Sequence, residues 1–296
     1  MNKSFTLIEI LVVIVIIGII SAFIIVSMSG VSEKARIAKS QAFSNSIKNS
    51  LMLNLVSEWR MDDASGTTAQ DHWGANPGTW FGAGGGTYTS PSWRTASECV
   101  SGGCLAFDGT DDYVNCGSGA SLNIIGPLTI SVWVKPSLLA GDNRRVAGKG
   151  TTDSYEIGLD NNGYPRFDVD FATSGLQSII GTTAISLNSW HHIVGTYNSS
   201  TMKLYYDGAV TGTPVSMSES ITVSSTDFLI GKRSSHNDDW FNGLIDDVRI
   251  YNAAIPISQI QQNYYLGLNK LLFNEGVAFE EFNQRLAELK NNLANN

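Results

Sequence analysis

The sequence predicts an α+β protein with a long N-terminal membrane and stem α-helix, an antiparallel β-sandwich and a short C-terminal helical hairpin. Residues 10–26 form an uncharged apolar run, which is typical of a membrane helix. The middle of the chain is rich in glycine, serine, threonine and aromatic residues, a composition typical of many short strands joined by turns. Near the end, residues 268–293 carry apolar side chains at helical spacing.

The composition of the 296-residue chain indicates a folded protein and argues against one function class. Hydrophobic residues make up 43% of the sequence, which is enough for a full-sized core. The formal net charge is -8, whereas a surface that binds nucleic acid must neutralise phosphates with lysine and arginine. We therefore expect no nucleic-acid partner.

The N-terminal apolar run is long enough to cross a membrane. Residues 10–32 contain no charged side chain, and at about 1.5 Å per residue they exceed a hydrocarbon layer of about 30 Å. One interpretation is a secretory signal peptide cleaved near Ser27-Met28-Ser29, or a simple signal anchor. Glu9, at the edge of the run, argues against it, because a carboxylate in apolar surroundings is costly unless a partner neutralises it.

The segment around Glu9 resembles the class III signal of type IV pilins and pseudopilins, with a short basic leader, Ser4, Phe5 and then Glu9 four residues later. The resemblance implies that a prepilin peptidase cuts between Ser4 and Phe5 and methylates the new amine of Phe5. It also implies that Glu9 faces the N-terminal amine of a neighbouring subunit in a helical homo-oligomer. Two positions depart from the family, because Ser4 replaces the usual glycine and Val26 stands near the usual proline.

Beyond the apolar run, the sequence predicts an amphipathic stem. Apolar residues recur at helical spacing from Val31 to about Leu55. We therefore divide this part of the chain into a prepilin leader at residues 1–4 and a transmembrane and stem helix at residues 5–54. Basic residues just after the span oppose the pilin topology on a strict positive-inside count, but the processing signal favours it.

From residue 55 onward the sequence predicts antiparallel strands. Residues 129–134 and 203–206 have the spacing of strands with a buried face. Turn-forming dipeptides separate such runs: Asp-Gly at 108–109 and 207–208, and Asn-Gly at 162–163. This arrangement is typical of a sandwich of antiparallel strands.

Five phrases of this region resemble the LamG-like, or concanavalin A-like, jelly roll, and they occur in the order of that family. They lie at residues 59–67, 105–114, 131–136, 190–208 and 241–251. The resemblance implies a LamG-like jelly-roll head at residues 55–266, followed by a helical tail at residues 267–296. Because this sandwich hosts lectins, enzymes and adhesion modules, its function must be argued from its sites.

Neighbouring titratable residues do not predict an enzyme. His191 and His192 are expected on one strand, where neighbours point to opposite faces and cannot bind one metal ion together. Adjacent aspartates, such as those at 62–63, 111–112 and 246–247, diverge in the same way, whereas a glycosidase needs two carboxyl groups across one bond. No glutamate begins the Glu-x-Asp-x-x-Glu string usual in glycosidases of this fold. We therefore expect no catalytic residues.

The family resemblance also implies a structural calcium ion. LamG-like domains often hold calcium between the start of the domain and its last strand, and the candidate ligands here are Asp63, Gly66 and Asp247. Carboxylate and carbonyl oxygens are the ligands that Ca²⁺ takes. The alternative is that these are ordinary turn residues. No other cofactor is expected.

Ligand contact is expected at Trp240, because an exposed aromatic ring can stack on a sugar ring. Asp238 and Asp239 lie beside it in a polar loop, and loops at one rim of a sandwich commonly hold ligands. The alternative is that loop tryptophans cap the end of the sandwich. Three further tryptophans are expected in loops: Trp73, Trp80 and Trp93.

Three cysteines in an exported domain predict one disulfide and one free thiol. A Cys99–Cys104 bond would close a small glycine-rich loop and is the preferred pairing. The alternative is Cys104–Cys116, which requires residues 108–112 to turn a hairpin that places these two cysteines opposite each other.

The C-terminal part predicts helices. Residues 257–265 fit the closing helix of the LamG-like family, with Ser258 as its N-cap. Residues 268–293 predict two helical pieces broken at Gly276, with Phe282 on the apolar stripe. The sequence leaves open whether this tail docks to the sandwich, to the stem or to a neighbouring subunit.

Together these features predict a structural subunit of a type IV pilus-like filament. A single helix anchors the chain in the cytoplasmic membrane before assembly, and the assembled pilus is extracellular on the bacterial surface. The head then serves adhesion or surface coating, with a glycan or protein as ligand. The alternatives are a pseudopilin of a type II secretion system, a membrane-tethered glycan hydrolase that uses Asp238 or Asp239, and a glycan-binding protein on a signal anchor.

Overall fold

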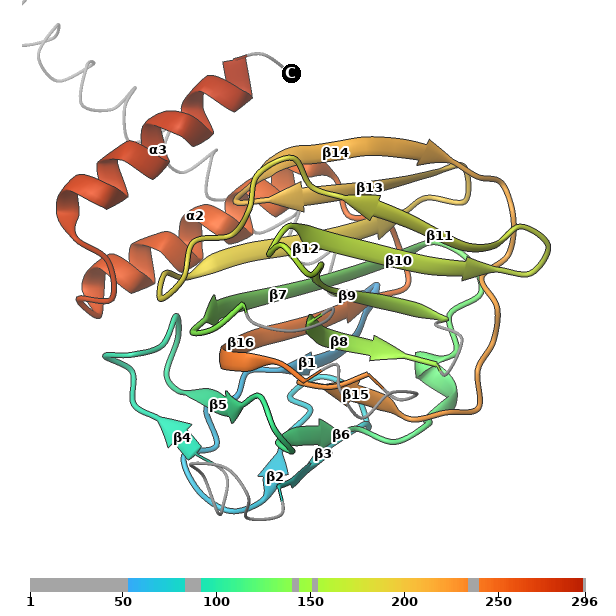
Figure 1. Ribbon diagram of the computed structural model, residues 1–296, viewed down its shortest axis with the longest axis horizontal. Helices are drawn as coiled ribbons and strands as arrows, with labels where there is room; N and C mark the ends of the chain where they lie inside the picture. Colours follow the sequence, from blue (N-terminus) through green and yellow to red (C-terminus); the bar gives the residue numbers. More distant parts are fainter. Residues whose placement is uncertain (1–52, 83–91, 140–143, 151–153, 234–239, 295–296) are drawn as a thin grey trace, which may run out of the picture. The chain divides into compact units, whose positions relative to one another are not determined.

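The computed structural model describes residues 53–82, 92–139, 144–150, 154–233 and 240–294 (Figure 1). The chain divides into two compact units, Met1–Leu53 and Asn54–Asn296, and all the described helices and strands belong to the second. The predicted leader, membrane helix and stem, with Ser4, Phe5 and Glu9, lie outside the described residues. Within the described part of the chain, no helix combines the length and the apolar character needed to span a bilayer.

Two antiparallel sheets form the body of this unit (Figure 1). The first has the strand order β14-β13-β12-β7-β16-β5-β4, with β1 paired to β16. Its strands are β1 (Leu55–Trp59), β4 (Ser92–Arg94), β5 (Cys104–Asp108), β7 (Leu128–Pro136), β12 (His191–Tyr197), β13 (Thr201–Tyr206), β14 (Ala209–Ser216) and β16 (Asn242–Tyr251).

The second sheet has the strand order β11-β10-β9-β8-β15-β6-β3-β2. Its strands are β2 (Thr68–Ala69), β3 (Gly78–Phe81), β6 (Tyr113–Asn115), β8 (Arg144–Lys149), β9 (Tyr155–Leu159), β10 (Pro165–Phe171), β11 (Gly175–Ile180) and β15 (Phe228–Ile230). A short 3-10 helix, Ala120–Leu122, precedes β7. The predicted antiparallel sandwich is thus confirmed.

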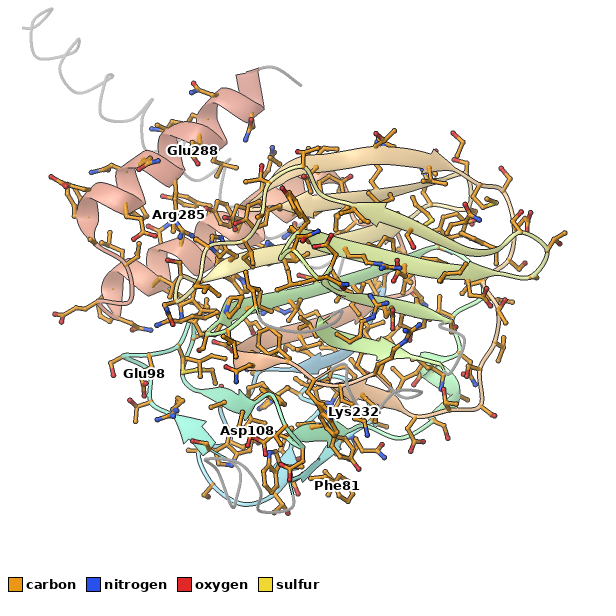
Figure 2. All side chains as sticks on the ribbon, viewed as in Figure 1. Phe81, Glu98, Asp108, Lys232, Arg285 and Glu288 are labelled. Atoms are coloured by element: carbon orange, nitrogen blue, oxygen red, sulfur yellow. A yellow bond between two sulfur atoms is a disulfide. The ribbon has the colours of Figure 1, made fainter. Side chains whose placement is uncertain are left out.

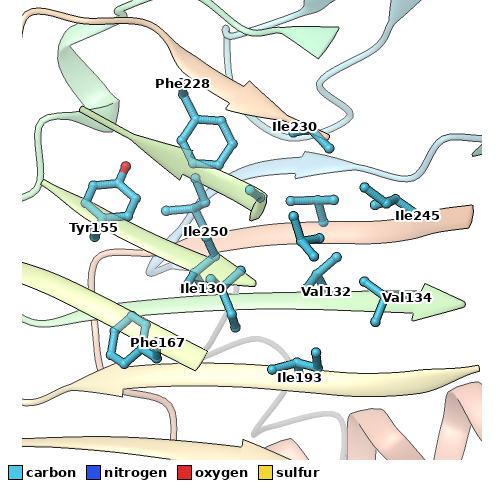
Figure 3. Close-up of a cluster of buried hydrophobic side chains, with 14 of the residues drawn as sticks. Ile130, Val132, Val134, Tyr155, Phe167, Ile193, Phe228, Ile230, Ile245 and Ile250 are labelled. Carbon is cyan, nitrogen blue, oxygen red and sulfur yellow. The ribbon is translucent and has the colours of Figure 1, made fainter. Parts of the chain in front are cut away.

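The main core lies between the two sheets and follows from the two-residue period of the strands. In β7, Ile130, Val132 and Val134 are fully buried and face the second sheet. Figure 3 shows these side chains opposite others from the second sheet, among them Tyr155 and Phe228. Burial of this apolar area is the main contribution to the stability of the fold.

The glycine-containing turns differ in what they connect. Asp207 and Gly208 both have positive φ, 49° and 80°, as a type I′ hairpin turn requires, and they join β13 to β14 as expected. By contrast, Asp108 and Gly109 lead the chain from β5 in the first sheet to β6 in the second. That connection is a crossing between sheets and not a hairpin.

The crossing from β5 to β6 determines which cysteines can pair. Cys99 and Cys104 are bonded, with their Cα atoms 5.4 Å apart, so the preferred pairing is confirmed. Cys116 is a buried free thiol. The alternative Cys104–Cys116 pairing was wrong because β5 and β6 belong to different sheets and do not face each other as hairpin partners.

A second core joins two C-terminal helices, α2 (Ile257–Phe273) and α3 (Phe279–Ala294), to the outer face of the first sheet. The Trp133 ring stacks on Tyr264 at a centroid distance of 5.7 Å. A Cβ on Gly267 would lie 2.2 Å from the Trp133 ring, so glycine permits the close approach of α2. The tail therefore docks to the sandwich of its own chain.

The helices differ in detail from the sequence expectation. The closing helix continues into the first tail piece, so the boundary drawn between residues 266 and 267 falls inside α2. Ser258 is not the N-cap; Pro256 holds that position and no side chain caps it. The break predicted at Gly276 is confirmed, because the chain turns between Asn274 and α3.

Candidate ligand-binding site

The outer face of the second sheet carries the candidate site at its β3–β6 end. Thr79 pairs with Asn115 and Phe81 pairs with Tyr113 across the two strands. Because side chains alternate along a strand, Trp80 and Val114 enter the core while these four residues lie on the opposite face. Phe81 is 43% exposed, and this end of the sandwich therefore presents an aromatic ring to solvent (Figure 2).

Three aromatic rings and one ammonium meet on this face, and we call them the aromatic group: Phe81, Tyr113, Trp240 and Lys232. The Phe81 and Tyr113 rings are stacked with centroids 5.0 Å apart, and the Tyr113 and Trp240 centroids are 5.9 Å apart. The Lys232 Nζ lies 5.1 Å from the Tyr113 centroid and 4.3 Å from the Trp240 centroid. Partial burial lowers the pKa of the Lys232 amine.

The bridge between Lys232 and Trp240 explains how the sequence builds this group. It sets Lys232, two residues after β15, opposite Trp240, two residues before β16, and both lie close to Tyr113 of β6. Cation–π contact with tryptophan and tyrosine then holds the lysine over the rings. The four side chains come from four separate segments of the chain.

A polar cavity of about 490 Å³ adjoins the aromatic group, and Phe81 belongs to both. The Asn115 amide donates to Asp227 Oδ2 at 2.8 Å, and Asn115 Oδ1 accepts from the Gly117 N–H at 2.8 Å. The cavity is lined by Ala75, Asn76, Pro77, Thr79, Phe81, Asn115, Cys116, Gly117, Gly119 and Asp227. Amide, hydroxyl and carboxylate groups beside an exposed ring can hold a polyhydroxylated ligand.

The structure places some of the residues predicted to contact ligand. Trp240 lies in the aromatic group, whereas Asp238 and Asp239 lie outside the described residues. Trp73 is 46% exposed in a loop, as expected. The loop positions expected for Trp80 and Trp93 were wrong, because they lie in β3 and β4.

The predicted calcium ligands have protein partners in the structure. The Gly66 carbonyl accepts from the Trp93 indole at 2.8 Å, and Asp63 Oδ2 accepts from the Gln70 N–H at 3.1 Å. Asp247 Oδ1 lies 3.0 Å from the Arg249 guanidinium. These contacts neither require nor exclude a cation, so calcium at Asp63, Gly66 and Asp247 stays a prediction.

His191 and His192 point to opposite sides of β12, as expected. His191 Nδ1 lies 2.8 Å from Asp207 Oδ2, and its Nε2 lies 2.7 Å from Ser186 Oγ. Asp207 Oδ1 also accepts from the His192 N–H at 2.9 Å. Although a serine hydrolase triad has the same order of contacts, the cavity described above does not include Ser186. These contacts tie the start of β12 to the β13–β14 turn.

His192 is enclosed in the second core. Its ring stacks on Trp133 at 5.0 Å, and its Nε2 lies 2.8 Å from Ser131 Oγ. Burial lowers the pKa of His192 to about 3. The folded protein therefore keeps this ring neutral at a pH where the unfolded chain protonates it.

We expect His192 to make stability fall with acidification. Below about pH 6.5 the unfolded chain binds a proton at His192 that the folded state does not bind. The free energy of unfolding therefore falls by up to about 1.4 kcal/mol per pH unit. A His192→Phe variant keeps an aromatic ring but does not titrate. Its free energy of unfolding, measured by urea denaturation, should therefore fall less steeply than that of the wild type between about pH 6.5 and pH 4.5. Parallel slopes for the two proteins would contradict the expectation. Asp246 is present in both, so its raised pKa cancels in the comparison.

Phe81, Tyr113 and Lys232 were not predicted as ligand contacts from the sequence. Phe81 and Trp80 are neighbours on a short strand, and the larger ring of Trp80 points inward. The alternation of inward and outward side chains along residues 78–81 could have predicted that Phe81 faces solvent once Trp80 is placed in the core. No local signal connects Lys232 with Trp240, because their contact depends on how β15 and β16 are placed.

Two family models match the chain. The model described as the concanavalin A-like lectin/glucanases superfamily matches residues 108–261. The model described as the prokaryotic N-terminal methylation motif matches residues 1–25. No curated protein matches the sequence.

Solved structures share the fold of the sandwich. The binding domain of Paraclostridial Mosquitocidal Protein 1 has a TM-score of 0.59 at 18% identity, over 74% of this chain and 53% of that one. Domain 4 of AbnA, a GH43 extracellular arabinanase from Geobacillus stearothermophilus solved with arabinotriose, has a TM-score of 0.55 at 19% identity, over 71% and 97%. The botulinum neurotoxin serotype D binding domain has a TM-score of 0.54 at 14% identity, over 73% and 52%. The chain thus spans about half the length of the first and third structures, and at these identities the likeness shows the fold alone.

Proposed function

The chain belongs to the concanavalin A-like lectin/glucanases superfamily, and we propose that it is a type IV pilin-like filament subunit whose sandwich binds carbohydrate. The methylation motif at residues 1–25 supports the first half of this proposal. The aromatic group beside a polar cavity supports the second half, and it is the observation that carries the proposal.

The arrangement of groups suits a sugar. The exposed ring of Phe81 offers an apolar face to the C–H groups of a pyranose or furanose, and Trp240 extends that face. Asp227 and Asn115 in the adjoining cavity accept from and donate to hydroxyl groups. A structural neighbour, domain 4 of an arabinanase, was solved with arabinotriose, which makes arabinose oligosaccharides a first choice of ligand.

The proposed role is binding without turnover. Glycoside hydrolysis uses two carboxyl groups across the scissile bond, and Asp227 supplies the one carboxylate among the described residues that line the cavity. The contribution of the head to the filament is then display of this face.

The proposed assembly uses the N-terminal segment. Prepilin peptidase would cut between Ser4 and Phe5 and methylate Phe5, after which the apolar helix leaves the cytoplasmic membrane for the filament core. Burial of apolar area between subunits contributes about 25 cal/mol per Å² before ordering costs. Glu9 would pair with the Phe5 amine of a neighbouring subunit and set the axial register.

A panel of oligosaccharides that includes arabinotriose tests the binding half. The full chain in detergent should bind at least one member by isothermal titration calorimetry. Phe81→Ala and Trp240→Ala should each weaken that binding about tenfold or more, which corresponds to about 1.4 kcal/mol. Release of shorter sugars in the same incubations would favour the hydrolase alternative instead.

The matched control is Phe273→Ala, because Phe273 is an 88% exposed phenylalanine on α2, away from the sheet face. Its affinity should equal that of the wild type. Equal losses for Phe81→Ala and Phe273→Ala would indicate a general effect on the protein and would contradict a site on the β3–β6 face.

A further inference from the structure

Three carboxylates gather where the chain crosses from β5 to β6. Asp108, Asp111 and Asp112 each contribute an oxygen, and these oxygens all lie within 4.8 Å of one another. Two ligands of one Ca²⁺ ion, each about 2.3–2.6 Å from it, lie no more than about 5 Å apart. The spacing of the three oxygens is therefore that of ligands around a single ion.

The most deeply buried member of this group lacks a partner on one side. Asp112 is 1% exposed. Its Oδ2 accepts from the Asp108 N–H at 2.9 Å, whereas its Oδ1 has no hydrogen-bond donor within the described structure. A buried carboxylate oxygen without a donor or a cation is costly. This orphaned oxygen indicates a group that the protein chain alone does not supply.

Asp108 likewise has one carboxylate oxygen with a hydrogen-bond donor and one without. Its Oδ1 accepts from the Thr110 N–H at 2.8 Å, and its Oδ2 is buried without a hydrogen-bond donor in the same part of the structure. The turn thus uses one oxygen of Asp108 and one of Asp112 to shape the backbone. The other oxygen of each remains available to a ligand.

Among the described residues, Asp108 and Asp112 have no basic partner to balance their negative charge. Asp108 and Asp112 form no ion pair with any described residue. Burial above all, and then the Asp108 and Asp111 carboxylates, raise the pKa of Asp112 to about 7. A bound cation would balance the charge of the Asp108 and Asp112 carboxylates, for which the described structure shows no ion pair.

We propose that Asp108, Asp111 and Asp112 bind a calcium-class divalent cation. All the ligand atoms are hard oxygens, which Ca²⁺ prefers, and no nitrogen or sulfur donor suited to zinc belongs to the group. The ion would tie the end of β5 in the first sheet to the start of β6 in the second. This site is distinct from the predicted one at Asp63, Gly66 and Asp247, and it does not depend on carbohydrate binding.

Calcium added to the chelator-treated full chain tests the site by thermal unfolding. At a concentration about 100-fold above the dissociation constant, Ca²⁺ should raise the melting temperature by roughly 5–10 °C. Asp111→Asn should abolish most of that rise. Asp63→Asn, at the predicted alternative site, should retain it. A rise that survives Asp111→Asn but disappears in Asp63→Asn would overturn the proposal, as would no rise at about 10 mM Ca²⁺.

A second measurement covers the case in which a variant folds poorly. Terbium is a luminescent stand-in for calcium. Tryptophan should sensitise its emission in the wild-type chain, because the Trp80 ring and Asp112 Oδ1 both lie beside Gly82 and are therefore close to each other. Ca²⁺ should displace the terbium and extinguish the signal. Absence of sensitised emission in the folded wild-type chain counts against the site without reference to any variant.

Discussion

Replacing Arg145 with alanine should lower the free energy of unfolding of the sandwich by about 3–5 kcal/mol. Arg145 lies in β8 with its side chain 2% exposed, and its guanidinium is 2.6 Å from Glu156 and 2.9 Å from Asp168. These two acids are opposite each other across β9 and β10. Without Arg145, two buried carboxylates would face each other with much of their compensation removed.

The remaining cations cannot replace it. Arg166 contacts the other oxygen of Asp168 at 2.8 Å, and Arg233 is 3.7 Å from the other oxygen of Glu156. Neither bridges the two acids as Arg145 does. The large cost therefore arises from the charges left behind and less from the pair itself.

Urea denaturation followed by tryptophan fluorescence measures this loss in the full chain. All seven tryptophans lie between residues 59 and 240, and Trp133 and Trp190 also contact the C-terminal helices, so the signal reports the sandwich together with the helices packed on it. Arg60→Ala is the matched control, because Arg60 pairs with Glu58 at 2.8 Å but its side chain is 47% exposed. It should cost less than about 1 kcal/mol.

A compensated variant separates charge from packing. Arg145→Met combined with Glu156→Gln and Asp168→Asn removes these three charges and should recover part of the lost stability, because no buried carboxylate is then left without a cation. Arg166 and Arg233 lose one acidic contact each, but their side chains are 18% and 15% exposed and can be hydrated. If the triple variant is as unstable as Arg145→Ala, the buried charges are not the cause of the loss.

Local patterns predicted those features of the fold that local physics decides. Alternation along β7 and β12 was sufficient to predict which side chains enter the core and that His191 and His192 diverge. The Cys99–Cys104 pair closes a short loop and needed no knowledge of the sheets. The β5–β6 crossing was misjudged as a possible hairpin, because an Asp-Gly turn has the same sequence whether it joins strands of one sheet or of two.

Local patterns did not predict which residues meet in the aromatic group or in the aspartate cluster. Tyr113 belongs to a family phrase and Trp240 was singled out, but their contact with Phe81 and Lys232 depends on the strand order β15-β6-β3. Asp111 and Asp112 were set aside because neighbours on a strand diverge. They lie in a turn ahead of β6, where that rule does not apply.

Replacing Glu9 with alanine is expected to abolish incorporation of the subunit into filaments. In the proposed filament the Glu9 carboxylate neutralises the methylated Phe5 amine of a neighbour within apolar surroundings, and loss of one partner of a buried pair costs about 3–5 kcal/mol. This corresponds to a decrease of about 10²- to 10³-fold or more in the association constant at each contact. A helical polymer repeats the same loss at every subunit, so sheared surface filaments should fall below detection.

Cleavage and methylation should survive the substitution, which separates assembly from processing. N-terminal mass spectrometry of membrane fractions should find methylated Phe5 in both the wild type and Glu9→Ala. Glu33→Ala is the matched control, because Glu33 is the next acidic residue after the apolar run, and its filament yield should be unchanged. An unprocessed Met1 would favour the signal anchor, and a mature start near Gly30 would favour a secretory signal peptide. Normal filaments from Glu9→Ala would contradict the proposed pairing of Glu9 with the Phe5 amine of a neighbouring subunit.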